Sequence, residues 1–148
     1  MLRLIIIFFI ILFFESSSFS KDVYLTLRNE KVNLRQGPSF EYPIKIFYKK
    51  KFLPVLIQEV YGNFKKIKDH ENNSGWIHVS QLSKKKAALT YGDKIIMFKN
   101  PTIFSTPLAI LEKGRLCLIS KCKEKWCKIK TDKYLGWVKK ESLWGNFN

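Results

Sequence analysis

The sequence contains one pattern written twice, and this repeat restricts the folds that the chain can adopt. In the first copy, residues 28–82, the motif Phe-Lys-Lys-Ile-Lys precedes a short loop and Gly75-Trp76-Ile77. In the second copy, residues 91–143, Trp-Cys-Lys-Ile-Lys precedes a shorter loop and Gly136-Trp137-Val138. A period of about 60 residues is too long for one solenoid unit and fits a duplicated small domain. The chain therefore holds two modules of the size of a binding domain, with little room for an enzyme.

Residues 1–20 are typical of a secretory signal. A short positive start, Met1-Leu2-Arg3, precedes an uninterrupted apolar run from Leu4 to Phe14 and a stretch of small residues that ends at Ser20. As a helix, this run spans about 16 Å, roughly half the hydrocarbon thickness of a bilayer. A retained membrane anchor is therefore the weaker alternative. We expect a signal peptide at 1–20 and an exported protein, periplasmic or secreted, without a lipid anchor, because no Cys directly follows the apolar run.

The charge balance narrows the class of partner. The chain has 27 Lys and Arg against 12 Asp and Glu, a formal net charge of +15 at pH 7. For an exported protein, the anionic partners within reach are wall polymers, lipopolysaccharide, anionic lipid headgroups and acidic proteins. Nucleic acid is not an expected partner, because nearly all the basic residues are Lys, and bidentate recognition of guanine or phosphate favours Arg. The alternative is compositional: an AT-rich genome yields a chain rich in Lys, Ile, Asn and Phe without selection for any partner.

Short strand-forming segments separated by turn residues fill both copies, and we expect no helix outside the signal. The segments are residues 23–27, 44–47, 53–60 and 64–68 in the first copy, and 94–98, 108–111, 116–122, 126–130 and 135–138 in the second. Short strands at this spacing predict a small, strongly bent antiparallel barrel. We therefore predict an all-β chain with barrels at 21–83 and 89–148. The linker between them, at 84–88, is short enough for the barrels to pack together.

The three cysteines have different expected states. Cys122 and Cys127 flank a short polar segment, so in a hairpin with a loop of about four residues they face each other at bridging distance. In an oxidising compartment this geometry favours a disulfide. Cys117 lies inside the apolar run Leu116–Ile119. We expect it to be a buried, inert thiol.

The residues of the first copy also resemble a known family. Residues 32–39, Val-Asn-Leu-Arg-Gln-Gly-Pro-Ser, followed by Gly75-Trp76-Ile77, are similar to the N-[VL]-R-x-G-P-[SG]…G-W-[VI] signature of bacterial Src-homology-3-like (SH3-like) domains. The second copy resembles the C-terminal half of an exported two-barrel version of that family. The resemblance implies small β-barrels that bind wall components or partner proteins. Such barrels usually serve to direct another domain, such as an enzyme, to its target. Residues 97–100, Met-Phe-Lys-Asn, replace the Leu-Arg-Gln-Gly of residues 34–37, which argues against one ligand site shared by both copies.

Six side chains are candidates for a ligand surface: Arg35, Tyr42, Tyr48, Tyr61, Trp76 and Trp137. The arginine could hold an anionic group, although an Arg at a strand end beside a Gly-Pro turn more often bonds to the carbonyls of the neighbouring loop. The two tryptophans could stack on a sugar or a peptide, although after a Gly in a short strand they are more often half-buried in a barrel. The three tyrosines flank turns, where aromatic residues can be exposed, and are the better candidates.

We expect neither a cofactor nor a catalytic site. His70 and His78 are the only histidines, too few for a zinc site unless both converge with the cysteines, and we expect both to be non-ligating. A nucleophile–histidine–acid set or a paired-carboxylate cleft cannot be assembled from these residues. We therefore expect the protein not to be an enzyme, and we expect no catalytic domain beside the two barrels.

The function expected from these observations is binding at the cell envelope. The main hypothesis is a non-catalytic exported module that contacts a wall component or another anionic envelope polymer, with two barrels and a basic surface supplying avidity. The alternative is a periplasmic protein–protein interaction or assembly adaptor that does not touch the wall. A membrane is expected as a partner only through an uncleaved signal segment. An exposed aromatic patch between basic loops favours the first hypothesis, and a flat apolar strip along one barrel edge favours the second.

Overall fold

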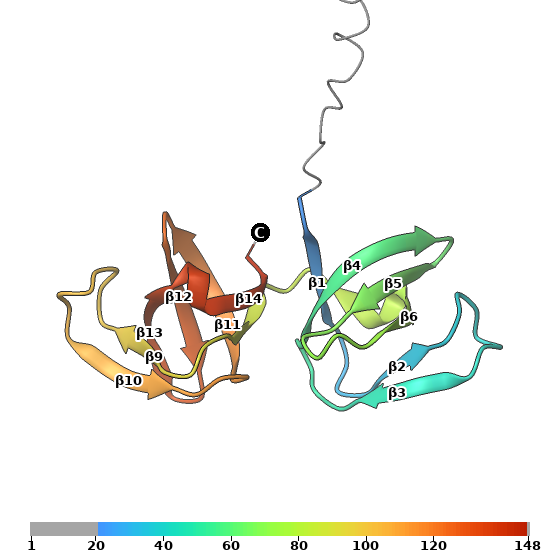
Figure 1. Cartoon of the computed structure of the whole chain (residues 1–148), viewed down its shortest axis with the longest axis horizontal. Coiled ribbons are helices and arrows are strands. Elements are labelled where there is room, and N and C mark those ends of the chain that lie inside the picture. The colour runs from blue at the N-terminus through green and yellow to red at the C-terminus, as the bar shows by residue number, and fades with distance from the viewer. Residues whose placement is uncertain (1–20, 148) are drawn as a thin grey trace, which may run out of the picture.

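A computed structural model describes residues 21–147 of the chain, which form two β-barrels side by side (Figure 1). The predicted signal segment at 1–20 lies outside the described residues. Strands and two single-turn 3-10 helices make up the regular structure of the described part. The all-β fold and the duplication predicted from the sequence are confirmed.

Barrel 1 is a seven-stranded antiparallel sheet with the strand order β3-β2-β6-β5-β4-β1-β7. Its strands are β1 (Val23–Leu27), β2 (Val32–Arg35), β3 (Ile44–Tyr48), β4 (Pro54–Tyr61), β5 (Phe64–Lys68), β6 (Ser74–His78) and β7 (Leu82–Ser83). The 3-10 helix η2 (Val79–Gln81) leads from β6 into β7.

Barrel 2 repeats this arrangement strand for strand, in the order β10-β9-β13-β12-β11-β8-β14. Its strands are β8 (Ala87–Thr90), β9 (Ile95–Phe98), β10 (Pro107–Leu111), β11 (Leu116–Lys123), β12 (Trp126–Thr131), β13 (Tyr134–Lys139) and β14 (Leu143–Asn146). The 3-10 helix η3 (Lys140–Ser142) takes the place of η2. The two sequence copies therefore fold into equivalent positions, and residues can be compared between them one by one.

Each barrel requires a glycine where its sixth strand passes its second. A Cβ on Gly75 would lie 2.7 Å from both the Arg35 carbonyl oxygen and Cγ of Leu34. A Cβ on Gly136 would lie 2.6 Å from Cγ of Met97 in barrel 2. Any side chain would push these strands apart, so only glycine permits the approach. This constraint explains why the Gly-Trp motif occurs in both copies.

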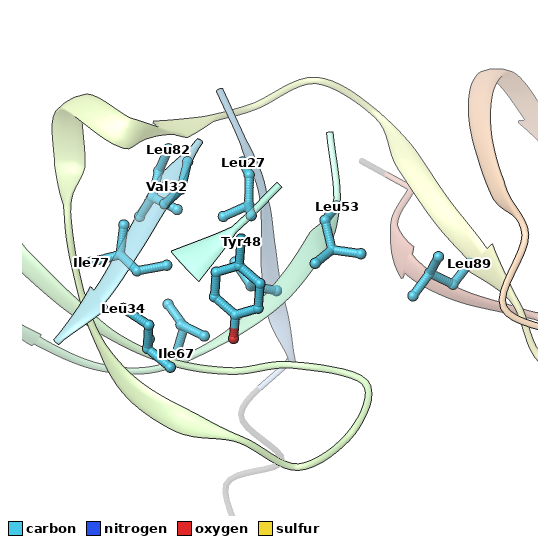
Figure 2. Packing of buried hydrophobic residues seen from close by; sticks show 10 residues of the cluster. Leu27, Val32, Leu34, Tyr48, Leu53, Ile67, Ile77, Leu82 and Leu89 are labelled. Carbon is cyan, nitrogen blue, oxygen red and sulfur yellow. The ribbon is translucent and has the colours of Figure 1, made fainter. Parts of the chain in front are cut away.

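Each barrel encloses an apolar core of its own. The core of barrel 1 includes the fully buried side chains Leu27, Val32, Leu34, Ile67 and Ile77 (Figure 2). The core of barrel 2 includes the fully buried side chains Met97, Cys117, Ile129 and Val138. In both barrels these residues alternate along the strands with outward-facing ones, as the two-residue period of a strand requires.

The two barrels are packed against each other. Leu89 of β8 belongs to the buried cluster of barrel 1, and Figure 2 shows it on the same side as Leu53. The ring of Trp144, in β14, meets the ring of Tyr24, in β1, edge to face at 5.2 Å between centroids. Apolar side chains of barrel 2 therefore complete the packing of barrel 1.

The connection between the barrels is held by side chains. Nδ2 of Asn146 donates hydrogen bonds to the carbonyl oxygens of Lys84, at 3.4 Å, and Lys85, at 3.3 Å. Ala87 and Ala88, assigned to the linker from the sequence, belong to β8 and are fully buried. They belong to the strand because each pairs with neighbouring strands on both sides, Ala87 with Leu118 and Asn146 and Ala88 with Cys117 and Gly145.

The cysteine states follow from the β11–β12 hairpin. Cys122 and Cys127 are direct cross-strand partners with a Cα–Cα distance of 4.0 Å, and they form the predicted disulfide. Such a short separation is typical of a pair without hydrogen bonds between its backbones. The strands run further than predicted, so the loop between them is only Glu124-Lys125. Cys117 is free and fully buried, as predicted.

The buried carboxylate of Asp69 organises the loop between β5 and β6. Its oxygens accept hydrogen bonds from the hydroxyl of Tyr48 at 2.8 Å, the backbone N–H of Glu71 at 2.9 Å and the backbone N–H of Asn73 at 2.8 Å. Nδ2 of Asn73 donates a further hydrogen bond at 2.9 Å. A buried carboxylate is tolerated when its lone pairs are used in this way. Asp69 therefore fixes the loop against the barrel 1 core.

The cysteine assignment predicts that alkylation of unfolded, unreduced protein modifies one cysteine. In the folded protein that thiol should react slowly at about pH 8, since burial raises the pKa of Cys117 to about 11 and the thiolate is the reactive form. Mass spectrometry after iodoacetamide treatment measures the number of modified cysteines in denaturant and the rate at which Cys117 is modified without denaturant. Three modified cysteines in protein from an oxidising compartment would contradict the disulfide.

The Tyr48–Asp69 pair predicts a loss of stability at alkaline pH. Burial, and then the hydrogen bond to Asp69, raises the pKa of Tyr48 above its ordinary value of 10.0. The unfolded chain therefore releases this proton near pH 10 while the folded chain keeps it, so stability falls as pH rises above 10. Tyr48→Phe should lower the free energy of unfolding by about 1–2 kcal/mol at neutral pH, and by less as pH rises above 10. Urea denaturation measures this, with Tyr61→Phe, at an exposed position, as the unaffected control.

Candidate functional site

Equivalent strands of the two barrels carry outward-facing rows of side chains. In barrel 1 the cross-strand rows over β4, β5 and β6 are Tyr61–Phe64–His78 and Glu59–Lys66–Trp76. In barrel 2 the rows over β11, β12 and β13 are Lys123–Trp126–Lys139 and Lys121–Lys128–Trp137. We call these two sets outer face 1 and outer face 2. Their chemistry differs although their backbones correspond.

Outer face 1 is covered by an aromatic side chain of its own barrel. Phe40, in the loop between β2 and β3, packs edge to face on Phe64 with ring centroids 5.2 Å apart. Its ring also lies 5.0 Å from the ring of His78. The first row of outer face 1 is therefore already in contact with a protein side chain.

Arg35 holds this covering loop in place. Its Nη1 donates hydrogen bonds to the carbonyl oxygens of Phe40 and Tyr42, each at 2.9 Å. Its guanidinium carbon also lies 5.4 Å from the centre of the Phe40 ring. The Tyr42 ring packs against Gly37, where a Cβ would lie 2.5 Å from ring atoms. The Arg-x-Gly-Pro segment therefore positions a loop.

Outer face 2 is open at the equivalent place. Ile103 takes the position of Phe40, and Phe98 takes the position of Arg35, so no guanidinium bonds to the loop carbonyls. Phe98 instead meets Trp126 edge to face at 5.8 Å between centroids. A cleft of about 790 Å³ lies here, lined by Pro101, Thr102, Ile103, Glu124, Lys125, Trp126, Lys139, Lys140 and Glu141.

Outer face 2 also contains like charges that face each other. Lys121 lies directly opposite Lys128 in the register of β11 and β12. At the same place in barrel 1, Glu59 lies opposite Lys66, with 3.9 Å between the carboxylate oxygen and Nζ. Like charges directly opposite each other across two strands are destabilising. Nζ of Lys121 lies 5.8 Å from the centre of the Trp137 ring, a position that offers some compensation through a cation–π interaction.

Six lysines of barrel 2 lie in outer face 2 or line its cleft, and the three that line the cleft do so together with Glu124 and Glu141. These six lysines are Lys121, Lys123, Lys125, Lys128, Lys139 and Lys140. The equivalent positions of barrel 1 hold Glu59, Tyr61, Asn63, Lys66, His78 and Val79. A genome-wide bias toward Lys codons acts on both copies equally. The difference between the copies therefore indicates that this concentration of charge is specific to outer face 2.

The ligand candidates chosen from the sequence are partly brought together. Arg35 is paired with Trp76 in the sheet, and the ring of Tyr61 lies 6.4 Å from that of Trp76. Tyr42 and Tyr61 are 47% and 64% exposed. Trp76 and Trp137 are only 9% and 7% exposed, which leaves little ring surface for stacking on a ligand.

Tyr48 is wrong as a surface candidate. Its side chain is 8% exposed and its hydroxyl bonds to Asp69. Alternation along β3 places Tyr48 on the inward side with Ile46, and the exposed aromatic residue of that strand is Phe47. A position next to a turn says nothing about which side of the strand a residue faces.

Trp126 and its surrounding lysines were not among the sequence candidates. The repeat contained the information needed to find them, because aligning the two copies places Trp126 at the position of Phe64. A comparison of charge between equivalent positions would have singled out Lys121, Lys123 and Lys139.

Metal and membrane-spanning features are not found in the part of the chain that the structure covers. Between residues 21 and 147, no three His, Cys, Asp or Glu side chains gather closely enough to hold a metal ion. In the same range, no helix is long and apolar enough to cross a bilayer. Nδ1 of His78 lies 2.7 Å from Oγ of Ser80, and the ring of His70 lies 6.3 Å from that of Trp144. The two histidines therefore contact different neighbours.

Comparison with known proteins identifies the module. The sequence model of the family described as bacterial SH3 domain matches the chain twice, over residues 28–84 and 92–145. Solved structures of NlpC2 and NlpC1 from Trichomonas vaginalis are similar at 13% and 14% identity, with TM-scores of 0.39 and 0.38. Each similarity covers 86% of this chain but 49% and 47% of the other chain, so this chain spans about half their length. The sequence matches no curated protein.

The like-charge pair predicts that Lys121→Glu stabilises the protein. The new carboxylate would face Lys128 as Glu59 faces Lys66, and should raise the free energy of unfolding by about 0.2–1 kcal/mol at low salt. The reciprocal Glu59→Lys should lower it by a similar amount, and both effects should shrink as salt rises. Urea denaturation at two salt concentrations measures them. If neither change has an effect at low salt, these side chains do not interact across the strands.

Proposed function

Since the chain belongs to the bacterial SH3 domain family, whose members are binding modules that often bind cell walls, we propose that it is a non-catalytic binding module of the cell envelope. Outer face 2 contacts an anionic envelope polymer, such as a component of the wall. The exported location rests on the signal-like residues 1–20.

The observation that carries this proposal is the cluster of lysines around Trp126. Lys121 and Lys128 are direct cross-strand neighbours, a position in which like charges repel, and barrel 1 has an attractive pair at the same position. An anion between the two ammonium groups would turn this repulsion into attraction. The arrangement therefore fits an anionic ligand better than it fits a purely structural role.

The chemistry of the cleft suits a polymer. A Lys ammonium is a compact point charge without the fixed fork of Arg, so a row of lysines accepts carboxylates or phosphates in many orientations. The partly exposed ring of Trp126 forms one wall of the cleft, and an aromatic face can pack against a sugar ring or an apolar side chain. A repeating anionic chain with sugar or peptide units provides both groups.

The two barrels have different roles in this proposal. Phe40 covers the first row of outer face 1, and Arg35 holds it there. We therefore assign the anion site to barrel 2, instead of dividing avidity between two equal sites. Barrel 1 supports barrel 2 through the packing of Leu89 and Trp144.

A pull-down with purified peptidoglycan tests the proposal. The double variant Lys121→Glu with Lys128→Glu should bind about tenfold or more weakly, since it replaces attraction to the polymer with repulsion. The matched control, Lys49→Glu with Lys50→Glu, makes the same change of net charge in the β3–β4 loop and should bind about as well as the parent. Trp126→Ala should weaken binding that persists at physiological salt, where exposed charges are screened beyond about 8 Å.

Two outcomes would contradict the proposal. Equal losses in the site variant and the control would mean that net charge alone drives attachment. A parent protein that binds no wall fraction at low salt would exclude wall binding and favour the adaptor function. Tyr42→Ala with Tyr61→Ala tests the candidates chosen from sequence, and should leave binding close to that of the parent.

A further inference from the structure

Barrel 2 has an exposed apolar surface beside the lysine cleft. Its members come from strands β9 and β10 and from the loop between them, and β10 is an edge strand of the sheet. They are Ile96 (44% exposed), Ile103 (57%), Phe104 (92%), Leu108 (40%) and Ile110 (67%). We call this set the edge patch. Ile96 and Ile110 are direct cross-strand partners, and Ile103 lines the same hollow as Ile96.

The loop that carries Ile103 and Phe104 has the same backbone structure as its counterpart in barrel 1. In barrel 1 its first and last residues are joined by a hydrogen bond from Gln36 N to Pro43 O, at 3.0 Å. In barrel 2 the equivalent bond runs from Lys99 N to Thr106 O, at 2.9 Å. Differences between the two loops are therefore differences of side chain on one backbone.

Three of the five edge-patch positions are polar in barrel 1, whereas Ile103 and Ile110 correspond to the exposed apolar residues Phe40 and Phe47. Ile96, Phe104 and Leu108 correspond to Asn33, Glu41 and Lys45 in the matching register of the strands and loop. The Lys45 ammonium donates a hydrogen bond to the Ser74 carbonyl oxygen, at 3.0 Å. Three polar or charged positions on one side of the fold have become apolar and exposed. Clustered exposed apolar residues on a soluble domain mark an interaction surface.

The charges around the patch select the partner. Lys94, Lys139 and Glu141 line the hollow that contains Ile96 and Ile103, so its charged side chains carry a net positive charge. Residues 87–148 as a whole hold twelve Lys and Arg against five Asp and Glu. Two such surfaces would repel each other, so a second copy of this chain is disfavoured and an anionic partner is favoured.

The shape of the patch favours a lipid surface over a protein. Phe104 is 92% exposed near the middle of its loop, and a protein partner would need a pocket of matching shape to receive it. The interfacial region of a bilayer accepts a protruding aromatic ring without such a pocket. Lysines beside an inserted apolar loop add attraction to anionic headgroups.

We propose that the edge patch docks on an anionic lipid bilayer. Ile103 and Phe104 enter the interfacial region, and the neighbouring lysines contact the headgroup phosphates. This adds a second ligand to barrel 2 and goes beyond the proposed function: the edge patch shares Ile103 with the cleft, but Ile96, Phe104, Leu108 and Ile110 do not line the cleft. Docking would hold outer face 2 next to the membrane surface.

Sedimentation with vesicles tests this inference. The processed protein, which begins near Lys21 once the predicted signal is removed, should bind vesicles of equal parts phosphatidylcholine and phosphatidylglycerol, and should not bind vesicles of phosphatidylcholine alone. Phe104→Ser should weaken binding by about tenfold, because an aromatic side chain no longer leaves water. Phe47→Ser is the matched control: Phe47 is 52% exposed on the edge strand of barrel 1, and its loss should change binding by less than about twofold.

The inference is overturned if the parent does not bind the anionic vesicles, which would leave an acidic protein as the occupant of the patch. It is also overturned if Phe104→Ser binds them as well as the parent, since attachment would then be electrostatic only. Neither serine substitution changes the net charge, so both variants should retain peptidoglycan binding. Lys121→Glu with Lys128→Glu should lose peptidoglycan binding, so failure of either proposal can be recognised separately.

Discussion

The close approach of backbones at Gly75 and Gly136 is the constraint on which the rest of the structure depends. Because no Cβ intervenes, β2 can join β6 and β9 can join β13, and each sheet bends round its core. The same junction fixes which residues face outward. Arg35 lies beside Trp76 in one barrel, and Phe98 lies beside Trp137 in the other. A substitution at either glycine would therefore affect the core and the outer face together.

Because the two barrels share one strand register, they have the same backbone fold but can present different outer faces. In barrel 1 the outward aromatic residues contact each other and Phe40, and Arg35 bonds to the loop that carries Phe40. In barrel 2 the guanidinium is replaced by a phenyl ring, the cleft is open and lysines replace neutral residues and one glutamate. Duplication allows this division, because one copy can keep a self-contained surface while the other exposes groups that suit a ligand.

The repeat, the strand pattern and the cysteine spacing were enough to predict two barrels and one disulfide, because these depend on local periodicity and on hairpin register. The surface depended on information that local sequence does not carry. Tyr48 was misplaced because a turn-flanking position does not reveal the inward or outward phase of β3. The cover over outer face 1 forms because the β2–β3 loop folds back onto β5 and β6. This contact joins residues that are far apart in the sequence. The partial exposure of Trp126 likewise depends on the neighbouring loop, in which Ile103 stands at the position of Phe40.

The free-energy cost of the like-charge pair in outer face 2 is small compared with the stability of a folded domain. Facing ammonium groups cost about 0.2–1 kcal/mol, whereas domains are stable by about 5–15 kcal/mol. The Cys122–Cys127 bridge constrains the hairpin that carries both lysines, and Trp144 and Leu89 join barrel 2 to the core of barrel 1. These interactions keep the register that holds the lysines together. A bound anion removes the repulsion only in the folded state, where Lys121 and Lys128 are neighbours, so ligand binding should also stabilise barrel 2.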